Sequence, residues 1–206
     1  MKNQFLIGLL SLLLGFVSVY AQGHGKIGIR VAGGISSLHD DVYKFSPASA
    51  YSLGFIFMEQ NKPFFVKYEL LVETKGAWYK QANNAYPLSL TPKNRFNLAS
   101  MSLYILPVFR FKDGKQSLIS GVSLSYFVAS VSPRFYEPYG YIRFSHFDAA
   151  VVLGYNYAFF KKGFWEMQIE PRLNYSLFNI NNHELNSSRW TRNIVAQLGL
   201  NFVLNK

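Results

Sequence analysis

Residues 64–75, FFVKYELLVETK, alternate between apolar and polar side chains. One parity is apolar or aromatic and holds Phe64, Val66, Tyr68, Leu70 and Val72. The other parity carries the charge and holds Lys67, Glu69, Glu73 and Lys75. A period of two predicts a β-strand with two unlike faces. In a soluble sandwich the charged face would meet water, whereas in a membrane barrel it would point inward and the apolar face would meet lipid.

Seven further segments have the length and patterning of strands. The eight expected strands are 26–36, 50–59, 63–75, 96–111, 117–130, 146–160, 164–178 and 192–204. Short and long connections alternate between them. The short ones are 59–62, 112–116 and 161–163, and the long polar ones are 37–50, 76–95, 131–145 and 179–190. This alternation is typical of an outer-membrane barrel with tight periplasmic turns and long external loops.

The composition agrees with a membrane barrel. Half of the residues are hydrophobic and only 16% are charged, against about 25% charged in soluble domains. Each expected strand has the roughly 9–11 residues that a tilted strand needs to cross a bilayer. Because an open sheet edge in hydrocarbon would hold unpaired backbone groups, the strands should close. We predict an all-β fold, a closed eight-stranded antiparallel up-and-down transmembrane β-barrel with periplasmic termini.

Residues 1–21 have the layout of a cleavable signal peptide, with Lys2, an apolar run and Ala21 at the expected cut. An uncleaved anchor helix is the alternative, but the run is shorter than the ~20 residues that a spanning helix needs. Residues 22–206 are expected to form one barrel domain. The chain has no cysteine, which excludes disulfides. Its net charge of +10 is scattered along an exported chain, which favours lipid phosphates over nucleic acid as its partner.

Charged residues of inward parity should meet inside the barrel. Because unpaired charges would be costly there, we expect a plug of ion pairs and hydrogen bonds of mixed sign. Its expected members are Arg30, Lys67, Glu69, Glu73, Arg110, Asp148, Glu166, Glu170 and Arg172. Side chains fill the lumen of an eight-stranded barrel, so we expect no solute conduction, and a narrow channel is an alternative. Pro107 and Pro171 fall inside strands, and we expect a local bulge at each.

The ordered strands resemble the PorT-like outer-membrane β-barrel family of Bacteroidetes. The resemblance rests on KIGIRVAGGISSL (26–38), VKYELLVETKGA (66–77), LYILPVFRFK (103–112), GVSLSYFVAS (121–130), AVVLGYNYAF (150–159), IEPRLNYSLFNI (169–180) and AQLGLNFVL (196–204). Ile105 departs from the family pattern, in which many members carry an acid at that position. The resemblance implies an outer-membrane location in a Gram-negative, Bacteroidetes-like bacterium. The namesake of the family serves type IX secretion and gliding, but the family implies no single activity.

Enzymes among small outer-membrane barrels need a histidine paired with serine or an acid near the outer rim. On a strand, Ser145 would face away from His146, whereas Asp148 would share its face. We expect a hydrogen-bonded rim histidine here, with a lipid-A-modifying or other envelope enzyme as the alternative. The run from His39 to Asp41 is a weak candidate for a divalent cation, and we expect a solvated loop. No catalytic, cofactor-binding or metal-binding residue is predicted.

Aromatic residues of the long connections are candidate contacts for glycans or proteins. They are Trp78, Tyr79, Tyr136 and Tyr139, although an interfacial girdle is the favoured interpretation. The predicted function is that of a non-enzymatic outer-membrane barrel with a plugged lumen. It would act through external loops or as an accessory of the envelope or of a secretion system. Expected partners are outer-membrane lipid and lipopolysaccharide, the barrel assembly machinery and other envelope proteins, without a cofactor.

Overall fold

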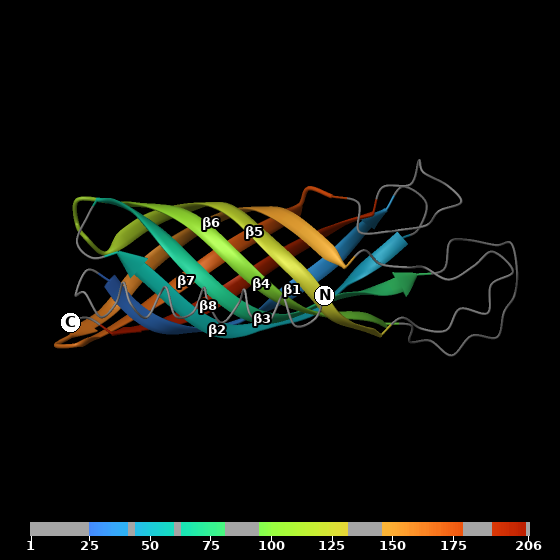
Figure 1. Ribbon diagram of the computed structural model, residues 1–206, viewed down its shortest axis with the longest axis horizontal. Coiled ribbons are helices and arrows are strands. Elements are labelled where there is room, and N and C mark those ends of the chain that lie inside the picture. The colour runs from blue at the N-terminus through green and yellow to red at the C-terminus, as the bar shows by residue number, and fades with distance from the viewer. Residues whose placement is uncertain are drawn as a thin grey trace, which may run out of the picture.

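The computed structural model describes residues 25–40, 44–59, 63–80, 95–131, 146–178 and 191–204. They form eight strands: β1 (Gly25–Asp40), β2 (Lys44–Glu59), β3 (Phe64–Lys80), β4 (Arg95–Arg110), β5 (Gln116–Val131), β6 (Phe147–Lys162), β7 (Trp165–Ser176) and β8 (Thr191–Leu204). Each strand pairs antiparallel with the next, and β8 pairs with β1, which closes the barrel (Figure 1). The predicted closed eight-stranded antiparallel barrel is therefore confirmed. The expected signal peptide lies outside the described residues.

Two tight turns lie at one end of the barrel. In the β4–β5 turn, Gly114 has φ of 68°, and Phe111 N donates to Gln116 O at 2.9 Å. Gly163 has φ of 56° in the β6–β7 turn. Glycine adopts such positive φ values at no steric cost, which explains why both turns carry it. The start of β1 and the end of β8 lie at this same end, since Ile27 pairs with Leu204 (Figure 1).

The expected long connection at 37–50 is wrong. β1 continues to Asp40 and β2 begins at Lys44, so most of these residues are strand. Likewise β3 continues to Lys80, which places Trp78 and Tyr79 on a strand and not in the loop predicted at 76–95. The inward residues here are small, such as Ala48 and Ala50. Alternating small and polar residues keep the pleat but give little hydrophobic signal, so the sequence pattern fades before the strands end.

The bulges expected at Pro107 and Pro171 are also absent from the described ladders. Pro107 pairs with Val66 of β3, while on its other side the β4–β5 ladder skips it and resumes in the same register. Pro171 pairs with Leu198 of β8, and the β6–β7 ladder likewise continues without a shift. Each proline thus leaves a gap in one ladder, because it cannot donate a hydrogen bond, but it does not displace the chain. The register shifts lie elsewhere: Pro47/Tyr51, Ala99/Ser100 and Ala158/Phe160.

Apolar residues occupy part of the barrel interior. The larger cluster consists of Ile56, Met58, Phe65, Leu71, Tyr104, Leu106, Val108, Ile119, Val152 and Val203. A smaller one, near the end opposite the tight turns, consists of Leu38, Ala77, Leu98 and Phe127. The remaining interior is polar and charged, so the lumen of the described barrel is lined by two kinds of surface. No described segment forms a helix long and apolar enough to cross a membrane.

Candidate functional site

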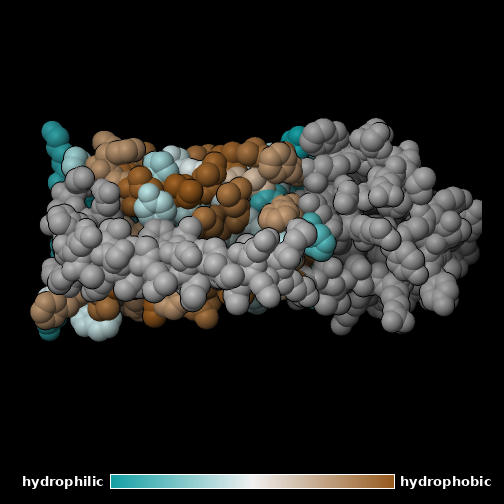
Figure 2. Space-filling view, in the orientation of Figure 1, coloured by the Kyte–Doolittle hydropathy of each residue, from teal (hydrophilic) through white to brown (hydrophobic). Residues whose placement is uncertain are grey.

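The outer wall of the barrel is apolar. Side chains of one parity on each strand point outward, and large hydrophobic residues among them are strongly exposed, such as Ile29, Val72, Leu124 and Leu153. The visible wall in Figure 2 is accordingly mostly brown, with hydrophilic side chains toward its two ends. The charged parity of β3 points inward, where Lys67, Glu69, Glu73 and Lys75 are buried. The arrangement is the reverse of a soluble barrel and is the one that a lipid-facing barrel requires.

Aromatic side chains flank the apolar wall at both ends. At the tight-turn end the exposed aromatic residues are Phe64, Phe109, Phe111, Phe159, Phe160, Phe164 and Trp165. Toward the other end the outward aromatic residues are Tyr51, Tyr126, Phe147 and Tyr175. Beyond Tyr175 lies Arg192, which donates from Nη1 to the tyrosine hydroxyl at 2.8 Å. Two aromatic girdles around an apolar band are typical of barrels that cross a membrane.

The buried charges of the interior balance. Five bases and five acids are buried among the described residues: Lys26, Arg30, Lys67, Lys75 and Arg172, and Glu69, Glu73, Asp148, Glu166 and Glu170. Each of the five bases lies within ion-pair distance of a buried acid. Because a buried charge without a partner is strongly unfavourable, this matching is what allows so many ionised groups inside one small barrel.

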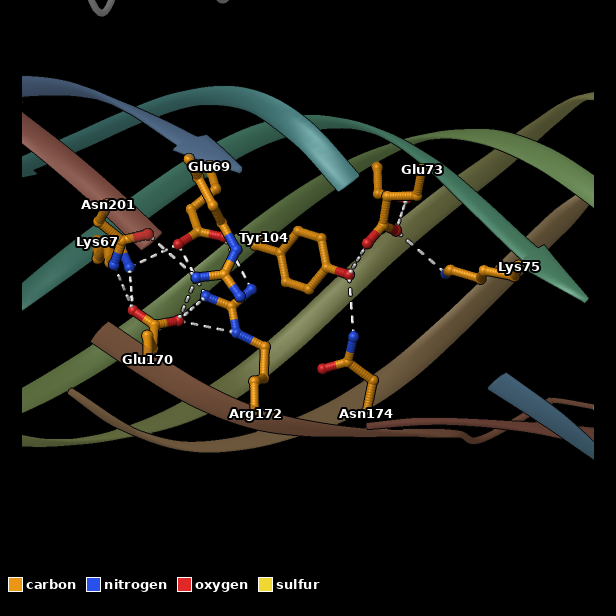
Figure 3. Close-up of polar contacts among 11 residues, drawn as sticks. Lys67, Glu69, Glu73, Lys75, Tyr104, Glu170, Arg172, Asn174 and Asn201 are labelled. Carbon is orange, nitrogen blue, oxygen red and sulfur yellow. Dashed lines mark hydrogen bonds and ion pairs between the residues drawn. The ribbon is translucent and has the colours of Figure 1, made fainter. Parts of the chain in front are cut away.

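Glu170 lies at the centre of the network. Its Oε1 accepts from Arg30 Nη1 at 3.0 Å, and its Oε2 accepts from Lys67 Nζ at 2.5 Å. Arg172 Nε donates to Oε1 at 3.0 Å, and Asn201 Nδ2 donates to Oε2 at 2.9 Å. Three cations and one amide from β1, β3, β7 and β8 therefore meet on a single carboxylate (Figure 3).

Glu69 shares two of these cations. Arg172 binds both of its carboxylate oxygens at 2.8 Å, and Lys67 Nζ lies 2.6 Å from Oε1. We call the set of Arg30, Lys67, Glu69, Glu170 and Arg172 the central cluster. It holds three bases and two acids, and it joins β1, β3 and β7 across the lumen. Bidentate arginine–carboxylate geometry fixes both side chains, so the cluster acts as a rigid cross-brace.

Glu73 forms a second cluster farther from the tight turns. It accepts hydrogen bonds from Tyr104 at 2.8 Å and from Ser102 at 2.6 Å, and Lys75 Nζ lies 3.2 Å away. Asn174 Nδ2 donates to the Tyr104 hydroxyl at 3.1 Å. The Arg172 guanidinium lies 5.0 Å from the centroid of the Tyr104 ring. Tyr104 therefore connects the Glu73 cluster to the central cluster (Figure 3).

A third set of contacts lies nearer the tight turns. Lys26 Nζ donates to Glu166 Oε2 at 3.1 Å, and Gln168 Nε2 donates to Glu166 Oε1 at 2.6 Å. Asn156 Nδ2 in turn donates to Gln168 Oε1 at 2.9 Å. These contacts join β1, β6 and β7 between the central cluster and the tight turns. Polar side chains thus link strands at three levels of the interior.

Eight of the nine residues predicted for the plug are buried in the interior, but Arg110 is placed differently. Arg110 is half-buried at the tight-turn end, with its guanidinium 4.9 Å from the centroid of the Phe65 ring. No ion pair joins it to another described side chain. Asp148 lies inside, where Ser176 donates to it, and it makes no ion pair with a described residue.

The plug expected from the sequence leaves out several members of the network: Lys26, Lys75, Ser102, Tyr104, Gln168, Asn174 and Asn201. Their inward parity was the available signal, since each falls on the same face as a predicted plug residue of its own strand or of a paired strand. Tyr104 was the hardest to identify, because an aromatic residue in a membrane strand is expected to face lipid. Its hydroxyl is the polar group that explains its inward position.

The prediction that His146 and Asp148 share a face is wrong. His146 is exposed and stacks on Tyr126 with ring centroids 6.1 Å apart, whereas Asp148 is buried inside the barrel. A chain that bends at His146 before β6 begins does not keep the strand parity. Ser145 lies outside the described residues. His146 and Asp148 therefore do not form the hydrogen-bonded pair on which the enzyme alternative depended.

The remaining candidate residues are only partly described. His39 is exposed on β1, and Asp41 lies outside the described residues. The described part of the chain holds no group of three or more His, Asp or Glu residues placed to bind a metal ion. Trp78 is half-buried on β3, Tyr79 is described only in its backbone, and Tyr136 and Tyr139 lie outside the described residues. The proposed loop contact thus stays a prediction.

Solved barrels that are similar in structure to this chain include three small membrane proteins. The first is Ail, the attachment invasion locus protein of Yersinia pestis, in complex with the heparin analogue sucrose octasulfate, with 14% identity, a TM-score of 0.43 and coverage of 87% of this chain and 99% of that chain. Neisserial surface protein A has 11% identity and a TM-score of 0.47, with coverage of 87% of this chain and 97% of that chain. The outer membrane protein AlkL in DMPC bilayers has 12% identity and a TM-score of 0.42, with coverage of 87% of this chain and 90% of that chain. The similarity is one of fold. No protein-family model and no curated protein matches the chain, so membership of the PorT-like family stays a prediction.

Proposed function

We propose that this protein is a non-enzymatic barrel of the outer membrane of a Gram-negative bacterium, with a lumen closed by its own side chains. The observation that carries the proposal is that the barrel wall is apolar outside and charged inside, the reverse of a soluble barrel. Apolar residues are exposed on the outer surface, and balanced charges are buried in the interior. Hydrocarbon is the environment in which such an outer surface is stable. The exposed aromatic residues at each end fit the two interfaces of a bilayer.

The closed lumen is supported by the density of interior contacts. The central cluster crosses the lumen from β1 and β3 to β7, and the apolar clusters occupy other parts of the interior. An ion that entered the lumen would have to displace charged groups that are already paired. The free energy lost with those ion pairs would exceed the free energy gained from the new contacts. We propose that the barrel does not conduct solutes. Its role would then lie in its external connections or in association with other envelope proteins.

Planar-bilayer recording tests the closed lumen. Purified protein should add no stepwise current, whereas a general porin in the same bilayers should give discrete steps. A charge-preserving variant of an exposed residue outside the lumen, Lys161→Arg, serves as a matched control for the preparation. Reproducible single-channel steps from the wild type would contradict the proposal and favour the narrow channel. A test of location accompanies it: the protein should stay in the membrane fraction after a carbonate wash.

The orientation is a further part of the proposal. We place the tight turns, Gly25 and Leu204 in the periplasm, because short turns face that side in outer-membrane barrels. Photo-crosslinking residues at Tyr79, Tyr139 and Lys161 in living cells test both orientation and partners. Crosslinks from Lys161 to periplasmic proteins, and from Tyr79 or Tyr139 to lipopolysaccharide or surface proteins, are expected. The reverse pattern would contradict the orientation.

A further inference from the structure

The central cluster holds three bases and two acids, so it carries an excess of one positive charge. The other two buried bases, Lys26 and Lys75, are each matched by one acid. The interior as a whole balances only because of Asp148, which lies on β6, accepts from Ser176 and makes no ion pair with a described residue. The excess of the central cluster is therefore not neutralised by a direct contact with another described side chain. An anion bound at the cluster would lower the cost of burying this charge.

Arg30 is the base of the cluster that has unused hydrogen-bond donors. Its Nη1 donates to Glu170 Oε1 at 3.0 Å and to Asn201 Oδ1 at 3.1 Å. Its Nε and Nη2 are buried and have no hydrogen-bond partner among the described residues. In Arg172, by contrast, Nε, Nη1 and Nη2 all donate to carboxylates. A buried donor without an acceptor is costly, so we expect an acceptor other than the described side chains at Nε and Nη2 of Arg30.

Gln197 lies next to these unused donors. It pairs with Arg172 of β7 on one side and with Gly34 of β1 on the other. The Arg30 guanidinium covers Gly199, the neighbouring inward residue of β8, because a Cβ there would lie 2.4 to 2.6 Å from its Nη1, Cζ and Nη2. Gln197 therefore has two arginine side chains as neighbours, yet its Nε2 and Oε1 both lack a partner among the described residues. Unused donors from β1 and β8 thus occur at adjacent inward positions of the lumen wall.

The lumen wall beside these donors has small side chains. From Arg30 toward the end opposite the tight turns, the inward residues of β1 and of the facing part of β2 are Ala32, Gly34, Ser36, Ala48, Ala50 and Ser52. Large side chains of these two strands therefore do not fill this part of the lumen. A monatomic anion needs little more room than a water molecule. A phosphate or carboxylate ligand would need more room and more donors than this part of the wall offers.

We propose that the barrel interior holds one small monovalent anion, chloride or another halide, which accepts from Arg30 Nε and Nη2 and from Gln197 Nε2. The anion neutralises the excess charge of the central cluster and gives three buried donors an acceptor. A water molecule could accept from the same donors but would leave the excess charge, and hydrogen bonds between ionised partners are the stronger ones, so the anion is favoured. The site agrees with a closed lumen, because its donors are otherwise unpaired and the anion is enclosed when the barrel folds.

The dependence of stability on chloride tests the site. Full-length chain is unfolded by urea in phosphatidylcholine vesicles at constant ionic strength, while sodium gluconate is replaced stepwise by sodium chloride. An anion that binds only the folded barrel raises the folding equilibrium constant by one plus the ratio of its concentration to its dissociation constant. For the wild type we expect a rise of about tenfold between about 1 mM and about 100 mM chloride.

Three variants locate the effect. Arg30→Lys keeps a positive charge for Glu170 but lacks the unused donors, so the chloride effect should disappear. Gln197→Leu keeps every charge and removes one donor, so the rise should fall to about threefold or less. The matched control Gln168→Leu removes a buried glutamine outside the site and should keep the full rise, although it lowers stability. Crystals grown in sodium bromide give an independent readout, because an anomalous peak is expected beside Arg30 and Gln197.

Each other result would overturn the site. A wild type whose stability does not depend on chloride would exclude it, and an equal rise in the Gln197 and Gln168 variants would indicate an unspecific salt effect. Ordered density beside Arg30 without anomalous scattering from bromide would show a water molecule only. If Arg30→Lys does not fold, the comparison of the two glutamine variants still decides. None of these results bears on the closed lumen, which the current recordings test separately.

Discussion

Arg172 holds Glu69 through two parallel hydrogen bonds of 2.8 Å across the barrel interior, although the two residues are 103 positions apart in the chain. Both side chains are fully enclosed. The same guanidinium also donates to Glu170 on its own strand. One arginine thus neutralises part of two carboxylates and braces β3 against β7. The two strands are not neighbours in the sheet, so this contact supports the closed shape independently of the backbone ladders.

Replacing Arg172 by methionine should destabilise the barrel by about 3–5 kcal/mol, because Glu69 and Glu170 would stay buried with fewer partners. The free energy of unfolding is measured by urea titration in lipid vesicles, followed by tryptophan fluorescence. In the double variant Arg172→Met/Glu69→Gln, the loss should be smaller than the sum of the two single losses, because the unpaired carboxylate is gone. Strict additivity would show that the pair does not interact energetically.

Removing the Tyr104 hydroxyl should cost about 1–3 kcal/mol, because Tyr104→Phe leaves Glu73 and Asn174 each without one buried partner. Tyr155→Phe is the matched control. Its hydroxyl donates to Gln116 at 2.7 Å on the half-exposed outer side, so its loss should cost less. Both variants are compared in the same urea titration. If the Tyr155 variant lost as much stability as the Tyr104 variant, burial of the network would not be the cause.

The number and order of the strands, and which face of each is polar, follow from the sequence, because a period of two is read directly from residues such as Lys67 and Glu69. The sequence does not reveal which side chains contact one another inside the barrel. Lys75 was assigned to the charged face of β3, yet nothing in the chain indicated that Glu73 would bind it together with Tyr104. Such contacts depend on which strands face each other across the lumen, and closure and tilt decide that.

The absence of the expected bulge at Pro107 has a local cause. Pro107 was expected to shift the register, but a proline can leave one ladder unpaired on one side while the strand continues. Gly121 of β5 lies opposite this gap with φ of 151°, and a Cβ there would lie 2.2 Å from the Ile105 carbonyl oxygen. The close approach of β5 to β4 therefore depends on glycine, and a single sequence does not reveal this compensation.

Gly199→Ala should destabilise the barrel by about 1–3 kcal/mol through overpacking. A Cβ at this position would lie 2.4 Å from Arg30 Nη1, and Arg30 is enclosed and bonded to Glu170 and Asn201. The guanidinium would have to leave its place in the central cluster. Gly33→Ala is the control, since its Cβ would meet no atom nearer than 3.9 Å, from the Tyr51 ring. A Gly199 variant as stable as the Gly33 variant would show that Arg30 can shift without loss.

Gln197 offers a test in the opposite direction. Its side chain is buried, and neither Oε1 nor Nε2 has a hydrogen-bond partner among the described residues. A buried amide without partners is unfavourable, so Gln197→Leu should leave stability within about 1 kcal/mol of the wild type or raise it. Gln168→Leu is the contrasting variant, because this buried glutamine donates to Glu166 and accepts from Asn156, and its loss should be clearly destabilising. Both are measured by urea titration in vesicles. If Gln197→Leu were as damaging as Gln168→Leu, the amide would have to be bonded to water inside the lumen, and the interior would be wetter than the side-chain contacts alone indicate.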